Sequence, residues 1–219
     1  TALKDPSRLV GIHFFNPVAM MPLVEVVVGD ATNPETAYRA AAFVRRIDKL
    51  PLPVKDTPGF LVNAVLAPYM NEAMKCVDQG IAPETIDAAM LTFGMPMGPI
   101  ELADTVGLDV AVAAGRQLVG EADPPRKLVE LVGAGKLGKK TGQGFYAWVE
   151  GKAQKAASDG AADPALAQRM LKPLLDATQR LVDQGVVADA ELADAGVIFG
   201  TGFAPYTGGP MNYLERAEG

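Results

Sequence analysis

The sequence predicts a mostly α-helical fold that begins with a short α/β segment and continues as two repeated helical units. Short runs rich in branched apolar residues occur in the first 56 residues, and such runs favour strands. From residue 57 onward, apolar residues recur at helical spacing. A five-residue pattern at the end of the first long helical stretch returns, nearly unchanged, 105 residues later.

The first 56 residues are expected to form three strands and one helix. Asn16-Pro17 is a turn signal between the first two strands, which should therefore be neighbours in one sheet. Asn33 can cap a helix that has Pro34 at its first position. A sheet of this size leaves an exposed edge, so we expect upstream sequence to complete it. The predicted strands cover residues 8–15, 23–28 and 50–55, the last at or near a sheet edge.

The rest of the chain is expected to be helical, apart from a glycine-rich loop at residues 135–144 and a small, polar linker. Helices are predicted over 60–79 and 84–93, with amphipathic stretches in 98–133 and a further helical block over 164–216. The resulting domain prediction is 1–56, 57–149 for the first helical unit, 150–163 for the linker and 164–219 for the second helical unit.

The last block repeats the first. The two copies share in-register apolar positions as well as short identities, and neither amphipathic set is large enough to be stable alone, so the copies should pack together. The matching segments are Val77-Asp78-Gln79-Gly80-Ile81 with Val182-Asp183-Gln184-Gly185-Val186, Asp87-Ala88 with Asp194-Ala195, and Gly98-Pro99 with Gly209-Pro210.

Composition excludes several classes of partner. A net charge of −6 without a basic stripe makes nucleic acid an unexpected partner. No apolar run reaches the roughly 20 residues that span a bilayer, so no transmembrane segment is expected. Cys76 is the single cysteine and cannot form an intramolecular disulfide, which makes a reducing cytoplasm the expected location.

His13 is the only histidine, and it lies where a predicted strand gives way to a turn. Glu25 lies twelve residues further on, inside an apolar strand where a carboxylate needs a partner. If the two strands pair, the imidazole and the carboxylate can meet. A carboxylate that accepts one ring N–H fixes the tautomer and raises the basicity of the other nitrogen, as a general base requires. The alternative is a structural histidine at a strand end.

Four motifs occur along the chain at characteristic spacings. They are His13-Phe14-Phe15-Asn16-Pro17, Leu23-Val24-Glu25, Asp56-Thr57-Pro58-Gly59-Phe60-Leu61-Val62-Asn63, and Met97-Gly98-Pro99-Ile100-Glu101-Leu102-Ala103-Asp104. These motifs and their spacings resemble the L-3-hydroxyacyl-CoA dehydrogenase family, and the resemblance covers essentially the whole chain. It implies an NAD-binding Rossmann domain, of which this chain holds the end, followed by helical units of the 6-phosphogluconate-dehydrogenase C-terminal-like type that bind acyl-CoA and form dimers.

The resemblance also implies three site residues. His13 would take the proton of the 3-hydroxyl group, Glu25 would orient His13, and Asn63 would donate a hydrogen bond to the substrate oxygen. Neutral amide donors polarise a carbonyl without adding charge to a dry site. No metal is expected.

The chain departs from the family in its N-terminal part. No glycine fingerprint for a dinucleotide occurs near the N-terminus, and the family's catalytic serine lies upstream of its histidine motif. We therefore expect the NAD site largely upstream and this chain alone to be inactive. The glycine-rich loop lacks the strand–turn–helix context of a phosphate site, which favours a structural turn that docks Phe145, Tyr146 and Trp148.

The second helical copy and the segment Gly202-Phe203-Ala204-Pro205-Tyr206 are similar to the end of the multifunctional fatty-acid oxidation enzymes. Because the monofunctional enzymes are expected to lack that copy, the resemblance implies a dehydrogenase of β-oxidation, a homodimer through the helical units, and a thiolase as a candidate partner. A short-chain 3-hydroxybutyryl-CoA dehydrogenase is the alternative enzyme. A non-catalytic dimerisation module is the alternative of a different class.

Overall fold

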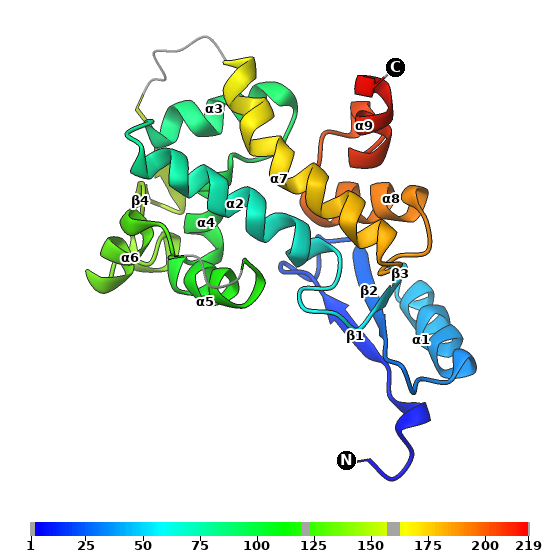
Figure 1. The fold of residues 1–219 in the computed structure, drawn as a ribbon. Helices are drawn as coiled ribbons and strands as arrows, with labels where there is room; N and C mark the ends of the chain where they lie inside the picture. The colour runs from blue at the N-terminus through cyan, green and yellow to red at the C-terminus, as the bar shows by residue number, and fades with distance from the viewer. Residues whose placement is uncertain (1–2, 120–122, 157–162, 219) are drawn as a thin grey trace. The chain divides into compact units, whose positions relative to one another are not determined.

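A computed structural model describes residues 3–119, 123–156 and 163–218 of the chain. These residues are mostly helical, with one sheet of three strands and one of two. They form two compact units, the first made by residues 1–64 with 177–219 and the second by residues 65–176 (Figure 1). No helix in the described ranges is both long and apolar enough to cross a membrane.

The first unit contains the three-stranded sheet, in the order β1-β2-β3, with β1 at Gly11–Phe14, β2 at Leu23–Val28 and β3 at Leu50–Lys55. β1 is antiparallel to β2, and β3 is parallel to it at the edge. The predicted strands and the turn between the first two are confirmed. β1 is shorter than predicted because Asp5 caps a 3-10 turn over Pro6–Arg8, which ends just before the strand.

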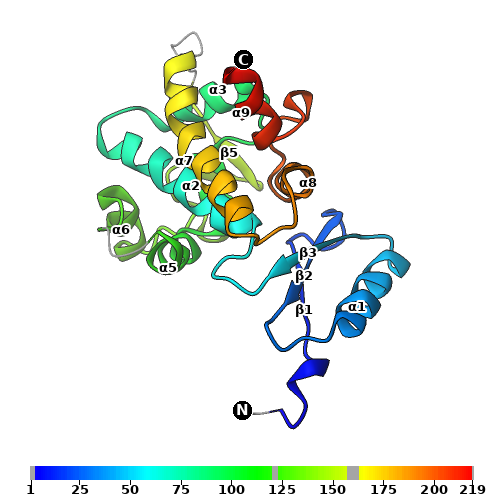
Figure 2. The same ribbon diagram turned by 45° about the vertical axis from the view of Figure 1, so that its right-hand side comes forward.

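One face of this sheet is covered by α1 (Pro34–Arg46), as Figure 2 shows. Asn33 caps the helix by accepting a hydrogen bond from the Glu35 N–H, and Pro34 occupies the first helical position, as predicted. Strand side chains alternate between the two faces, so alternate residues of β2 pack on α1. The shared core comprises Val24, Val26, Ala40 and Val44.

The opposite face of the sheet, which carries Glu25, is approached by α8 (Ala190–Thr201). Two helical glycines permit the close approach. A Cβ at Gly196 would collide with side chains of Leu52 and Leu61, and a Cβ at Gly200 would collide with Val62. Glu25 therefore lies beneath packed apolar residues and is fully buried. The unit also holds the end of α7 (Pro164–Asp183) and all of α9 (Pro210–Glu218).

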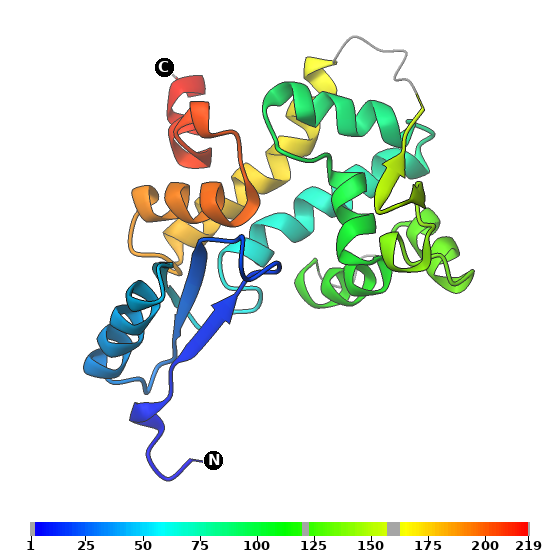
Figure 3. The same cartoon turned by 180° about the vertical axis from the view of Figure 1, so that it is seen from behind.

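The second unit holds most of two long helices and a set of shorter ones (Figure 3). α2 begins at Val62, two residues later than predicted, because Gly59 and Phe60 have positive φ angles that a helix cannot accommodate. α3 ends at a left-handed Gly94, as expected. The helices are α2 (Val62–Asp78), α3 (Pro83–Phe93), α4 (Pro99–Val106), α5 (Leu108–Leu118), α6 (Arg126–Gly133) and α7 (Pro164–Asp183).

The segment predicted as a linker, 150–163, begins with regular structure. Glu150 and Gly151 both have positive φ and form a tight turn between β4 (Ala147–Val149) and β5 (Lys152–Gln154). Residues 157–162 of that linker lie outside the described residues. The compact units also differ from the predicted domain ranges, because α8 packs on the N-terminal sheet while α2 and α7 run from one unit into the other.

Candidate functional site

The centre of the site is a histidine–carboxylate pair on neighbouring strands. His13 and Glu25 are directly opposite each other in the antiparallel β1–β2 register, and His13 Nδ1 lies 2.7 Å from Glu25 Oε2. The His13 side chain is 32% exposed, whereas that of Glu25 is fully buried. The contact that strand pairing allows is therefore present, with one ring nitrogen held and the ring open to solvent.

The second oxygen of Glu25 binds the entry to the helical region. Its Oε1 accepts hydrogen bonds from the backbone N–H groups of Leu61 and Val62, each at 3.0 Å. The first N–H groups of a helix lack intrahelical partners and carry partial positive charge, so a carboxylate stabilises them. With three hydrogen bonds the buried Glu25 is satisfied, and it connects the imidazole to the start of α2.

A tight turn sets the geometry of that entry. Pro58 precedes Gly59, whose φ is +79°, and the Phe60 N–H donates to the Thr57 carbonyl at 2.9 Å, as in a type II turn. Phe60 also has a positive φ, +49°, which is strained for a residue with a side chain. Its ring centroid lies 5.4 Å from that of His13, so the strained residue packs on the imidazole.

Asn63 is the second residue of α2, and its side chain is exposed. In the described contacts it is linked to Glu25 through the main chain of its neighbour Val62, rather than through its own amide. The structure thus brings His13 and Glu25 into direct contact and places Asn63 on the helix turn that Glu25 holds.

The loop between β1 and β2 is held by a lysine that the sequence patterns did not single out. Lys49 Nζ donates to the backbone carbonyls of Val18, at 2.7 Å, and Met21, at 2.8 Å. Lys49 lies just before β3 and belongs to no recognisable motif. Only the order of the strands could have revealed that it binds the loop between β1 and β2. Phe15, in the same loop, has its ring centroid 4.7 Å from His13.

A hollow of about 530 Å³ adjoins His13 and is lined by β1 and by residues 29–32 after β2. If Nδ1 carries the proton that it donates to Glu25, Nε2 of the neutral ring has a free lone pair. The arrangement can therefore take a proton from a group bound beside the ring, and Glu25 can stabilise the imidazolium that forms. The described residues contain no group of three or more His, Cys, Asp or Glu suited to a metal ion.

The glycine-rich loop is organised by Asp104 and not by a strand. Asp104 accepts hydrogen bonds from the N–H groups of Phe145 and Tyr146, both at 2.9 Å, and from Trp148 Nε1 at 3.0 Å. A Cβ at either Gly138 or Gly144 would collide with Asp104. A helix, α6, precedes the loop where a phosphate site would have a strand. Gly138 and Gly144 allow the loop to pack closely on Asp104, in agreement with the predicted structural turn.

The fold and site define a class of proteins in which the last strands of an α/β domain carry a histidine–carboxylate pair and a helical region follows. Residues 1–57 match the NAD binding domain of 3-hydroxyacyl-CoA dehydrogenase, and residues 59–148 match its C-terminal domain. The chain therefore belongs to the 3-hydroxyacyl-CoA dehydrogenase family.

Curated relatives cover almost the whole chain. The fatty acid oxidation complex subunit alpha of Vibrio cholerae is 38% identical over 97% of this chain and 32% of its own length. That of Shewanella putrefaciens is 37% identical over 98% of this chain and 33% of its own length. The chain thus spans about one third of the length of these relatives.

Solved structures share the fold. The match to a 3-hydroxybutyryl-CoA dehydrogenase from Escherichia coli K12 covers 99% of this chain and 65% of that protein's chain, with a TM-score of 0.82 and 26% identity. The match to the dehydrogenase part of multifunctional enzyme 1 from C. elegans covers 91% of this chain and 50% of that protein's chain, with a TM-score of 0.65 and 29% identity.

The E. coli match corrects one expectation. Since it extends over 99% of this chain, a protein named as a 3-hydroxybutyryl-CoA dehydrogenase contains the region of the second helical unit as well. That unit therefore does not by itself separate the multifunctional enzymes from the short-chain ones.

Proposed function

We propose that the full-length protein is an NAD-dependent 3-hydroxyacyl-CoA dehydrogenase, which oxidises (S)-3-hydroxyacyl-CoA to 3-oxoacyl-CoA in fatty-acid β-oxidation. The observation that carries the proposal is the 2.7 Å bond between His13 Nδ1 and Glu25 Oε2, in which the His13 side chain stays 32% exposed. The names of the two bacterial relatives support the assignment to fatty-acid oxidation.

In the proposed reaction His13 takes the proton of the 3-hydroxyl group on Nε2 as the carbon–oxygen double bond forms. Glu25 holds the ring and stabilises its positive charge, and the amide of Asn63 donates a hydrogen bond to the same substrate oxygen. In reverse, protonated His13 returns the proton. Glu25 also accepts hydrogen bonds from the N–H groups at the start of α2. One buried carboxylate therefore positions both His13, the base, and the helix turn that carries Asn63, the oxygen donor.

NAD supplies the acceptor for the hydride that leaves C3. The residues present fit the substrate end of such a site, because the hollow beside His13 is bounded by the small residues Gly11, Gly29 and Ala31. In the loop at 135–144, in contrast, Gly138 and Gly144 pack against Asp104, so they leave no room for a dinucleotide phosphate. No residue of this chain is assigned to the phosphates.

Two structural features support the proposal that the two helical units are repeats. α2 and α7 each contain an internal proline, Pro68 and Pro173. Asp87 and Asp194 each accept two backbone hydrogen bonds from the start of a following helix.

With two helical repeats, the proposed protein belongs to the multifunctional class, is cytoplasmic and has acyl-CoA as its substrate. It forms a homodimer through the helical units and has a thiolase as a partner. The relatives' designation as subunits of a complex supports assembly with other chains.

The second candidate is a 3-hydroxybutyryl-CoA dehydrogenase of short-chain metabolism, favoured by the extent of the E. coli match. The two candidates differ in the substrates they accept. Measuring kcat/KM of the full-length protein over a series of acyl chain lengths separates them, since activity confined to four-carbon substrates would establish the second and exclude the first.

The catalytic role of His13 is tested by His13→Ala in the full-length enzyme. Loss of general acid–base catalysis should lower kcat by about 10²–10⁴. His13→Gln keeps a donor toward Glu25 but lacks the base, so it should be equally slow while its thermal unfolding stays close to wild type. Near-normal turnover in either variant would show that His13 is a structural residue.

A further inference from the structure

Two aromatic rings pack on the imidazole of His13, and different parts of the first unit hold them. The ring centroid of Phe60 lies 5.4 Å and that of Phe15 4.7 Å from the centroid of the imidazole. Phe60 lies in the turn whose following N–H groups bind Glu25. Phe15 lies in the loop between β1 and β2, and the hydrogen bonds described for Glu25 do not reach that loop. The position of Phe15 therefore depends on a separate support.

The loop between β1 and β2, residues 15–22, is folded locally but exposes apolar side chains. The N–H groups of Met20 and Met21 donate to the Pro17 carbonyl, at 2.9 and 3.0 Å, and so form a compact turn. Val18 is 50% exposed and Met20 78%, so these side chains do little to fix the turn on the sheet. Because segments with few buried apolar contacts open readily, the turn needs a polar anchor.

Lys49 provides that anchor from the residue before β3. Its ammonium donates to the carbonyls of Val18, at 2.7 Å, and Met21, at 2.8 Å, and hydrogen bonds from a charged donor are roughly twice as strong as neutral ones. Pro17, whose carbonyl closes the turn, follows Phe15 by two residues. The contacts therefore run without a break from the ammonium, through the turn, to the ring that packs on the imidazole.

The end of α1 directs Lys49 at the turn. The Asp48 N–H donates to the Arg45 carbonyl at 3.1 Å, and the Lys49 N–H donates to the Val44 carbonyl at 3.2 Å, as in a Schellman motif. Asp48 has a φ of +57°, in the left-handed region that glycine usually occupies at this position. Since Leu50 begins β3 on the other side, the lysine side chain starts from main chain that is fixed on both flanks.

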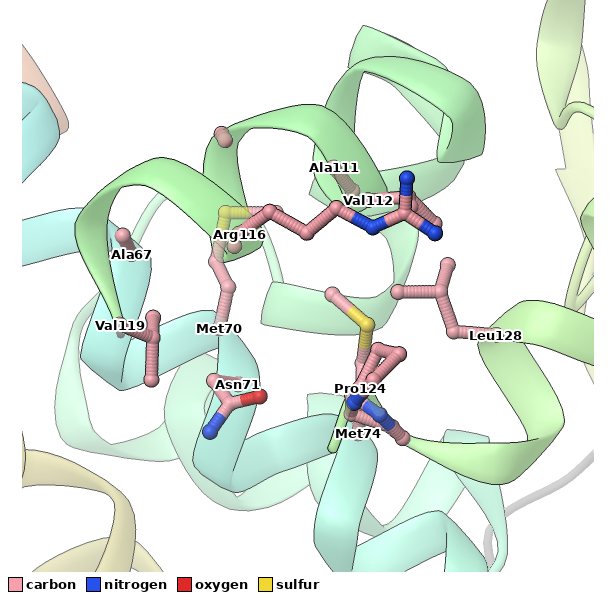
Figure 4. Close-up of a pocket in the computed structure, with 13 residues that line it drawn as sticks. Ala67, Met70, Asn71, Met74, Ala111, Val112, Arg116, Val119, Pro124 and Leu128 are labelled. Atoms are coloured by element: carbon pink, nitrogen blue, oxygen red, sulfur yellow. The ribbon is translucent and has the colours of Figure 1, made fainter. Parts of the chain in front are cut away.

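The cation that borders the pocket of the second unit shows a different arrangement (Figure 4). That pocket lies between α2, α5 and α6, and Arg116 is the charged residue among those that line it. The Arg116 stem runs across the pocket and the residue is exposed, as is common for a long cationic side chain on an apolar surface. Lys49 is half-buried, and its ammonium binds two main-chain carbonyls. The lysine thus makes a specific contact with the loop.

The contact matters because general base catalysis requires a fixed imidazole. Nε2 of His13 must come within hydrogen-bond distance of the hydroxyl group, and a misplacement of about 1 Å can cost about 10²-fold in rate. The bond from Nδ1 to Glu25 holds one point of the ring. The rings of Phe15 and Phe60 limit how far the imidazole can tilt about that point.

We propose that Lys49 is a positioning residue for the proton transfer. By holding the turn it keeps Phe15 against the imidazole, and so keeps Nε2 of His13 directed at the substrate oxygen. The proposal rests on the dehydrogenase activity proposed above. It gives the two aromatic rings beside His13 independent supports, Glu25 for Phe60 and Lys49 for Phe15.

The first test compares variants of Lys49 in the full-length enzyme. Lys49→Met should lower kcat for a 3-hydroxyacyl-CoA by about 10- to 100-fold and leave KM close to the wild-type value, because the ammonium binds the loop and not the substrate. Lys49→Arg keeps a cation that can donate to both carbonyls and should retain most of the rate. Arg46→Met is the matched control. It removes an equal charge from the exposed end of α1 and should change neither constant.

A double-mutant cycle with Phe15 separates positioning from a general loss of stability. Phe15→Ala removes the ring whose place Lys49 is proposed to set. In that background Lys49→Met should lower kcat by less than about twofold, because residues that act through one contact are not additive. Its effect on thermal unfolding should be the same in both backgrounds. If Lys49→Met does not fold, Lys49→Gln, which keeps a neutral donor, replaces it in the cycle.

Two outcomes would overturn the positioning role: unchanged kcat in Lys49→Met, or an equal loss of kcat in both backgrounds of the cycle. A wild-type enzyme that oxidises no 3-hydroxyacyl-CoA would instead refute the proposed dehydrogenase function. In that case the imidazole signals of His13 in NMR spectra still report whether Lys49→Met frees the ring, so the two failures are distinguishable.

Discussion

Two buried aspartates, one in each helical repeat, each cap the start of a helix, but they differ in their other hydrogen-bond partners. Asp87 on α3 and Asp194 on α8 each accept hydrogen bonds from the N–H groups of the second and third residues of a helix that starts with proline. Each proline lacks an N–H, so the carboxylate binds the first two donors that the helix offers. The donors are Ile100 and Glu101 for Asp87, and Met211 and Asn212 for Asp194.

In both places the residue before the proline is glycine, for a steric reason. A Cβ at Gly98 would collide with Asp87, and a Cβ at Gly209 would collide with Asp194. A helix normally takes its cap from a side chain at that position. Here the capping carboxylate comes from another helix, and the glycine leaves room for it. The Gly-Pro pair and the distant aspartate therefore make the helix cap together.

The difference lies in what else each carboxylate holds. Asp87 also accepts hydrogen bonds from the Tyr146 hydroxyl, at 2.8 Å, and from Lys155 Nζ, at 2.9 Å, and Lys155 in turn pairs with Glu101 at 2.7 Å. For Asp194, the hydrogen bonds shown in the described part of the chain come from the helix start alone. Around Asp87 the helix cap therefore also anchors the chain after the glycine-rich loop and after β5.

The largest effect should follow Asp87→Ala. It removes the acceptor of the Ile100 and Glu101 N–H groups and of the Tyr146 hydroxyl at a carboxylate that is 1% exposed, and it leaves Lys155 paired with Glu101. Each buried donor left unsatisfied costs about 1–3 kcal/mol, so the loss of three acceptors should cost about 3–5 kcal/mol in total. We expect the free energy of unfolding, measured by urea denaturation, to fall by about that amount. A loss below about 1 kcal/mol would mean that the anchor contributes little.

Asp194→Ala should cost less. It leaves the N–H groups of Met211 and Asn212 unpaired near the start of α9, and among the described residues it strands no charged partner. Unsatisfied buried donors cost about 1–3 kcal/mol, and Asp194 is 8% exposed, so water can reach part of the gap. The same urea experiment checks the value. A loss equal to or greater than that of Asp87→Ala would contradict the difference between the two units.

Strand pairing and turn signals were enough to predict the contact between His13 and Glu25, because both residues lie on short strands joined by a turn. The second half of that site was not predictable in the same way. The bonds from Leu61 and Val62 to Glu25 depend on the positive φ of Phe60, which residue type disfavours and tertiary packing imposes. The sequence repeat contained both Asp87 and Asp194, but a cap supplied by a different helix has no local spacing signature.

Lys155 is the clearest case of a residue hidden by its surroundings in sequence. It lies among small and polar residues that predicted a linker, yet its ammonium reaches Asp87 and Glu101. The contact spans 68 residues, and only the turn at Glu150 and Gly151 brings this part of the chain back. Composition describes the average polarity of a segment and does not show which distant residues one long side chain contacts.

The smallest effect, and the one that compares the two carboxylates most directly, concerns pH. Burial raises the pKa of Asp87 above its ordinary value of 3.8, and the hydrogen bond and charge of Lys155 act against that rise. Burial likewise raises the pKa of Asp194, opposed by the backbone N–H groups of Met211 and Asn212 and not by a cation. Removing the ammonium should therefore change the titration of one aspartate and not of the other.

In Lys155→Met we expect the pKa of Asp87 to rise further and that of Asp194 to stay unchanged, which carboxyl-carbon NMR titration measures. A carboxyl group with a raised pKa in the folded state contributes stability that is full below the unfolded value and is lost as pH rises through the folded value. The destabilisation caused by Lys155→Met should thus be least below pH 3.8 and grow toward neutrality. It should reach only about 1 kcal/mol, the usual worth of one such hydrogen bond, because Lys155 is 25% exposed and Asp87 keeps three other donors. An equal shift at both aspartates would show that the lysine acts through the fold as a whole, whereas a shift at Asp87 alone would show that Lys155 acts on that carboxylate directly.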